Sequence, residues 1–170
     1  ATTLGGVISG TGALVKNGAA GLTLNGANTF SGGTTLNAGV LTVGNNNALG
    51  TGALSLGGNA SLDAGVAVNL GNAIDLGANT LSVLGSNATT LGGVISGTGA
   101  LVKNGASNLT LGGTNTFTGG LTLNAGTLTL ASAAALGTGA LTVGGASTLA
   151  NSAAMTLNNG VNLGANLTLA

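Results

Sequence analysis

The sequence predicts an all-β chain that winds as a parallel β-solenoid, with short strands stacked coil on coil. Three observations carry this prediction. The residues Ala1–Gly18 recur unchanged at Ala88–Gly105, short runs alternate apolar and polar residues, and 35 glycines are spread through the 170 residues. Tandem repetition is typical of solenoids, in which each unit buries its apolar face on the next. Helical repeats are excluded because each interior glycine would cost about 1 kcal/mol relative to alanine.

The repeat has a period of 87 residues, which divides the chain into unit 1 (1–87) and unit 2 (88–170) of one continuous solenoid. A finer repeat is the string Gly-Thr-Gly-Ala-Leu, in steps of 40, 47 and 40 residues, which begins at Gly10, Gly50, Gly97 and Gly137. Half of such a step is about 20 to 24 residues, the length of one solenoid turn. We therefore expect about four coils per unit and about eight in the chain.

The expected strands are three-residue runs with two apolar side chains on one face, at 22–24, 41–43, 54–56, 68–70 and 74–76. Glycine, asparagine or serine bounds each run, and these residues tolerate tight turns. Because side chains alternate across a strand, Thr23 is predicted to face outward. The residues predicted to point inward, with their counterparts 87 positions later, are Leu22, Leu24, Leu41, Val43, Leu54, Leu56 and Phe30. Eight coils about 4.8 Å apart give a length of about 38 Å.

Charged residues are rare: the chain has two lysines, two aspartates and a net charge of zero. In a solenoid a charge repeated on every coil would form a like-charge ladder, whereas asparagine, threonine and serine can hydrogen-bond along the stack. Lys16 and Lys103 hold equivalent positions one unit apart, which at four coils is on the order of 19 Å. We interpret them as exposed charges that are screened from each other by salt.

Two stretches carry a family resemblance. They read GLTLNGANTFSGGTTLNAGVLTV at Gly21–Val43 and NLTLGGTNTFTGGLTLNAGTLTL at Asn108–Leu130, and both follow the segment GVISGTGALVKNG. This pattern resembles the autotransporter-associated β-strand repeat. The resemblance implies a right-handed parallel β-helix in the secreted passenger region of a bacterial surface protein. It brings no catalytic residues, and the second copy departs from the first where Leu121 replaces Thr34.

The sequence predicts no enzyme and no catalytic, cofactor-binding or metal site. Acid–base catalysis at neutral pH needs a histidine or a tuned carboxylate or lysine, and the whole inventory is Asp63, Asp75, Lys16 and Lys103. We interpret Asp63 and Asp75 as isolated residues; the alternative is a carboxylate pair brought together by the coils. Replacing all four charged residues is expected to leave the function intact. A neutral chain is not expected to bind nucleic acid, and no apolar run is long enough to insert into a membrane.

Ligand binding has two candidate features. Phe30 and Phe117 occupy equivalent positions and are interpreted as core residues, with a sugar-stacking platform as the alternative. An ice-binding face would need a regular array of outward threonines. The candidates are Thr23, Thr42, Thr110 and Thr129, and the series is interrupted at Ser55, Asn69 and Asp75. We therefore expect an array too narrow and irregular for ice.

The function expected is that of a structural segment in an extracellular fibre, stalk or matrix filament at the bacterial cell surface. Ala170 lies four residues short of closing the second unit, and little charge protects the terminal strands. Exposed strand edges pair readily, so we expect head-to-tail self-association into a filament. The alternative is that neighbouring repeats of a longer chain supply the same contacts. An adhesin passenger module that binds a surface or glycan ligand is the alternative function.

Overall fold

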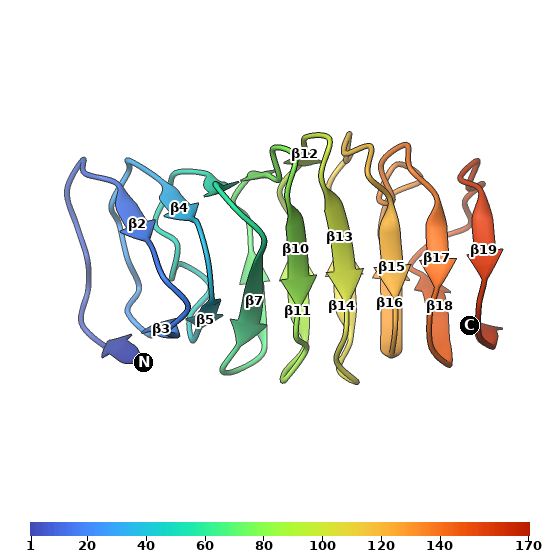
Figure 1. The fold of residues 1–170 in the computed structure, drawn as a ribbon, viewed down its shortest axis with the longest axis horizontal. Helices are drawn as coiled ribbons and strands as arrows, with labels where there is room; N and C mark the ends of the chain where they lie inside the picture. Colours follow the sequence, from blue (N-terminus) through green and yellow to red (C-terminus); the bar gives the residue numbers. More distant parts are fainter.

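A computed structural model describes all residues from Ala1 to Ala170 as a single solenoid of twenty short strands (Figure 1). Every strand pair is parallel, and the strands form three sheets that run along the solenoid axis. The structure contains no helix, and so none that is long and apolar enough to cross a membrane. The all-β class and the parallel β-solenoid predicted from the sequence are confirmed.

One sheet has nine strands and extends from the first coil to the last. Its strands, in order, are β1 (Thr2–Leu4), β3 (Leu22–Leu24), β5 (Val40–Val43), β7 (Ala60–Ala64), β10 (Thr80–Val83), β13 (Ala100–Lys103), β15 (Leu121–Leu123), β17 (Leu141–Val143) and β19 (Val161–Leu163). This sheet provides a continuous ladder of hydrogen bonds along the length of the molecule.

The other two sheets are shorter. The six-stranded sheet contains β8 (Val68–Leu70), β11 (Thr89–Leu91), β14 (Leu109–Leu111), β16 (Gly126–Leu130), β18 (Ser147–Asn151) and β20 (Leu167–Leu169). The five-stranded sheet contains β2 (Leu14–Lys16), β4 (Thr34–Leu36), β6 (Leu54–Leu56), β9 (Ile74–Asp75) and β12 (Ile95–Ser96). The five-stranded sheet therefore belongs to the first part of the chain and the six-stranded sheet to the last part.

Each turn of the solenoid takes about twenty residues. Paired strands are offset by 20 residues between β1 and β3, by 19 between β3 and β5, and by 21 between β5 and β7. The nine strands of the long sheet thus define about eight turns, as predicted. The right-handed winding stays a prediction.

The core is a narrow column of apolar side chains that alternate with outward polar ones. Leu54 and Leu56 are buried on either side of the half-buried Ser55, and the same pattern recurs in most strands. All residues predicted to point inward do so, and 31 buried residues form one hydrophobic cluster. Close stacking also selects glycine: Gly50 and Gly137 have φ of 66° and 62°, and a Cβ there would collide with the carbonyl oxygens of Phe30 and Phe117.

Equivalent residues of the two units lie on different faces of the solenoid. Strand β3 belongs to the nine-stranded sheet, whereas its equivalent β14 belongs to the six-stranded sheet. Likewise β2 and β4 belong to the five-stranded sheet and their equivalents β13 and β15 to the nine-stranded one. The reason is arithmetic: 87 residues at about twenty per turn make four and one-third turns. The expected four coils per unit were thus short by a third of a turn.

This offset explains the unequal lengths of the two shorter sheets. In each unit the segment Asn-Thr-Phe, at 28–30 and 115–117, has no strand. In unit 1 this segment lies between β3 and β4, on the face that the six-stranded sheet takes up from β8 onward. In unit 2 it lies between β14 and β15, where the five-stranded sheet has already ended. The irregular face therefore shifts by a third of a turn together with the repeat.

Candidate functional site

The two lysines are buried, which corrects the interpretation of them as exposed charges. Lys16 is 4% exposed and Lys103 is fully buried, because each takes an inward position at the end of a strand. Within the nine-stranded sheet Lys103 is stacked between Val83 and Leu123, which are core residues. An alternating pattern that reads Leu-Val-Lys places the lysine on the same side as the leucine, and this signal was already in the sequence.

Each lysine ammonium group binds backbone carbonyls at a corner of the solenoid. Lys16 Nζ donates to the carbonyl oxygen of Gly18 at 3.0 Å and to that of Ala38, one coil further on, at 2.9 Å. Lys103 makes the same pair of bonds to Gly105 and Ala125, at 2.6 and 3.0 Å. Each lysine therefore joins two successive coils, and burial lowers the pKa of Lys103 below 10.5.

The two aspartates lie apart. Asp63 belongs to β7 in the nine-stranded sheet, and its carboxylate accepts hydrogen bonds from the amide of Ser86 at 3.0 Å and its hydroxyl at 2.7 Å. Asp75 belongs to β9 in the five-stranded sheet and accepts the amide of Gly77 at 2.9 Å. The structure therefore does not bring the two carboxylates together as a pair: Asp63 joins two successive coils, and Asp75 accepts a bond within its own turn. No cluster of three metal-ligating side chains is present.

Two buried asparagines join successive coils, and neither was singled out from the sequence. Asn28 Oδ1 accepts the amide of Ile8 in the coil before it, at 2.8 Å, and its Nδ2 donates to the carbonyl of Ala48 in the coil after it, at 2.6 Å. Asn115 repeats both bonds with Ile95 and Ala135 at the same distances. These side chains join coils on the face that has no strand. The signal available in the sequence was that an asparagine lies two residues before the phenylalanine in both units.

The candidate ligand-binding residues do not form a site. Phe30 is 2% exposed and Phe117 is fully buried, so they fill the core as predicted and offer no platform for a sugar. Thr23 pairs with Thr42 in the nine-stranded sheet, while Thr110 pairs with Thr129 in the six-stranded sheet. The third-turn offset therefore splits the threonine series between two faces.

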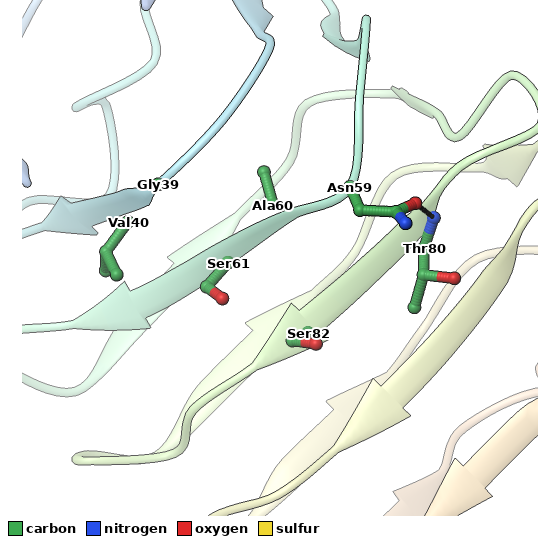
Figure 2. A pocket seen from close by; sticks show the side chains of 7 residues that line it. All are labelled: Gly39, Val40, Asn59, Ala60, Ser61, Thr80 and Ser82. Atoms are coloured by element: carbon green, nitrogen blue, oxygen red, sulfur yellow. Dashed lines mark hydrogen bonds between the residues drawn. The ribbon is translucent and has the colours of Figure 1, made fainter. Parts of the chain in front are cut away.

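A shallow groove lies on the outer surface of the nine-stranded sheet (Figure 2). In this view Val40, Ser61 and Thr80 extend to one side, while the buried Ala60 extends to the other. The drawn hydrogen bond runs from the amide of Thr80 to Asn59 Oδ1 at 2.8 Å. The lining carries hydroxyl and amide groups and no ionisable side chain, namely Gly39, Val40, Asn59, Ala60, Ser61, Thr80 and Ser82. Such a groove has no group suited to acid–base catalysis.

One protein family matches this chain. The family model described as passenger-associated-transport-repeat matches residues 14–43 and 101–130. The two matches are one repeat period apart, and each contains four strands, one cross-coil lysine and one buried asparagine. No curated protein and no solved structure gives a match. The repeat resemblance drawn from the sequence is confirmed, because this passenger-repeat model matches the chain at both of the places that carry the resemblance.

Proposed function

We propose that this chain is a stiff structural segment of a secreted bacterial passenger, located in a filament or stalk at the cell surface or in the extracellular matrix. The observation that carries the proposal is the unbroken nine-stranded sheet, which crosses the boundary between the units without an interruption in pairing. A force that pulls or bends the segment must act on the hydrogen-bonded ladders between its parallel strands, and these ladders lie over a common core. The passenger repeats support secretion as the route to that location.

The same proposal assigns no reaction to the chain. The ionisable side chains are two separate aspartates and two buried lysines whose ammonium groups are held by carbonyls. Burial of both phenylalanines gives the adhesin alternative no support, because aromatic platforms for sugars must be exposed.

The proposal includes end-to-end assembly, which a concentration series tests. Sedimentation velocity and electron microscopy should show oligomers and then filaments as the chain concentration rises. The control is Thr168→Lys, which adds a charge in β20 of the last coil and should reduce assembly through repulsion and desolvation. A wild-type chain that remains monomeric at high concentration contradicts end-to-end assembly.

A further inference from the structure

Several asparagines of the chain begin the sequence Asn-x-Ser/Thr, which is the acceptor sequence for a sugar on an asparagine side chain. They are Asn59, Asn87, Asn108 and Asn166. Because the chain is rich in asparagine, serine and threonine, the sequence alone does not say which of them can carry a sugar. The fold distinguishes them, since a modified asparagine must keep its Nδ2 atom free and exposed to solvent.

Asn59 meets this requirement. It is exposed, and its Oδ1 accepts the amide of Thr80 at 2.8 Å, while its Nδ2 makes no hydrogen bond within the chain. Asn59 directly precedes β7, at the groove on the outer surface of the nine-stranded sheet (Figure 2). The bond to Thr80 therefore holds the amide group in place and leaves its nitrogen available.

The hydroxyl of the same acceptor sequence lies on the same face. Asn59 and Ser61 both line the groove, and the buried Ala60 between them turns inward, as alternation along a strand requires. The side chain of Ser61 makes no hydrogen bond within the chain, so the amide and the hydroxyl are accessible together. Ala146 stands at the equivalent of Asn59 in unit 2, and the site therefore belongs to unit 1 alone.

Asn87 and Asn108 are already used by the fold. Asn87 Nδ2 donates to the carbonyl of Ala64 in the preceding coil at 2.8 Å, and Thr89, the third residue of its acceptor sequence, is buried. Asn108 Nδ2 donates to the hydroxyl of its own acceptor sequence at 3.1 Å, while its Oδ1 accepts the hydroxyl of Thr129 in the next coil at 2.9 Å. A sugar on either nitrogen would crowd the contacts that these amides make.

We propose that Asn59 is the attachment site of a sugar on the outer face of the nine-stranded sheet. Its Nδ2 attacks the anomeric carbon of a nucleotide-activated sugar that is held by a separate glycosyltransferase. The carbon–nitrogen bond forms as the bond from the anomeric carbon to the diphosphate oxygen breaks. The nucleoside diphosphate leaves with the electron pair, and one Nδ2 proton passes to a base of the transferase. The chain is the acceptor and needs no catalytic group of its own.

A sugar at this position supplies hydration that the charged residues of the chain do not. The net charge is zero, and two of the four charged side chains are buried lysines. Proteins without net charge tend to associate and precipitate, and an attached sugar is bulky and solubilising. The hydroxyls of Thr80 and Ser82, in the same groove, are free to hydrogen-bond to the first sugar ring. The inference does not depend on end-to-end assembly.

Glycosylation of the folded chain tests this selection. The reagents are UDP-glucose and a soluble N-glycosyltransferase that modifies unfolded peptides carrying each of the acceptor sequences equally well. The substrate is Asn166→Gln protein, because Asn166 is also exposed and would add a second product. Mass spectrometry of the folded protein should show one hexose per chain, located at Asn59, with Asn87 and Asn108 unmodified.

Matched variants identify the acceptor. Asn59→Gln and Ser61→Ala should each abolish the product, because the first removes the acceptor nitrogen and the second removes the hydroxyl that the acceptor sequence requires. Asn87→Gln is the matched control and should retain the product, because its nitrogen is held by the fold. A hexose at Asn87 or Asn108 in the folded protein, or no hexose at Asn59, overturns the inference.

The protein isolated from the bacterium that produces it provides the second test. Peptide mapping by mass spectrometry should find a sugar on Asn59, and it should find Asn87 and Asn108 unmodified. An unmodified Asn59 in this protein overturns the inference, whatever the result with the purified transferase. That outcome leaves the proposed structural role standing, because the strand ladders and the core do not involve the Asn59 side chain.

Discussion

The segments Ala1–Gly18 and Ala88–Gly105 have the same sequence and different surroundings. Leu4 is 37% exposed, whereas its equivalent Leu91 is fully buried. Ile8 is half-buried and has no strand, whereas Ile95 is fully buried in β12. The first segment has a coil on one side only, and the second has coils on both sides. Strand formation and burial in this solenoid therefore depend on stacking as much as on the local sequence.

The largest expected difference between the two segments is in how much a core leucine contributes to the free energy of unfolding. Leu91→Ala should lower the free energy of unfolding by about 2–5 kcal/mol, because it leaves a closed cavity. Leu4→Ala should cost about 1 kcal/mol, because its side chain is already partly in water. Chemical denaturation at concentrations where the chain is monomeric measures both. Equal losses would mean that the first coil is as tightly packed as the internal ones.

A glycine pair sharpens the same comparison. A Cβ on Gly99 would collide with the backbone of Asn79, whereas a Cβ on Gly12 would meet nothing within 4 Å. Neither residue has a positive φ, so the difference is one of packing and not of backbone strain. Gly99→Ala should destabilise by about 1–3 kcal/mol through overpacking, and Gly12→Ala should be neutral or slightly stabilising. Thermal unfolding of the two monomeric variants gives the comparison. A Gly99→Ala variant as stable as the wild type would show that neighbouring coils can move apart at little cost in free energy.

The sequence was sufficient for the turn length, the inward residues and the class of fold. Its period-two runs and 87-residue register each reflect a local rule, namely alternation along a strand and similarity between units. The third-turn offset was not predicted from the sequence. It is the remainder when the 87-residue repeat is divided by the turn length, and an error of one residue in the turn length is enough to hide it. The nine-stranded sheet makes that turn length visible, with offsets of 19 to 21 residues.

The lysines were misjudged, and the buried asparagines were missed, for a different reason. Lysine is rarely buried without a partner, so composition favoured an exposed charge at Lys16 and Lys103. Their partners are backbone carbonyls of a neighbouring coil, and a sequence does not show which carbonyls lie within reach. The same holds for Asn28 and Asn115, which hydrogen-bond to backbone groups 20 residues away on both sides.

The smallest expected effect concerns the pH dependence of stability, and it arises from the buried lysine of the second segment. Burial lowers the pKa of Lys103 in the folded chain below its value of 10.5 in the unfolded chain. Between these two pKa values the unfolded chain holds more protons, so stability should rise as the pH increases toward 10.5. Each unit by which the pKa is lowered contributes about 1.4 kcal/mol to this rise.

Lys103→Met tests that origin, because methionine fills a similar space in the stack between Val83 and Leu123 without an ionisable group. The alkaline rise should disappear in this variant and persist in Lys16→Met, which keeps Lys103. Histidine, cysteine and tyrosine are absent from the chain, so few other groups titrate in this range. Denaturation curves between pH 7 and pH 10.5 measure the effect. An unchanged rise in Lys103→Met would mean that the buried ammonium of the second unit is not its source.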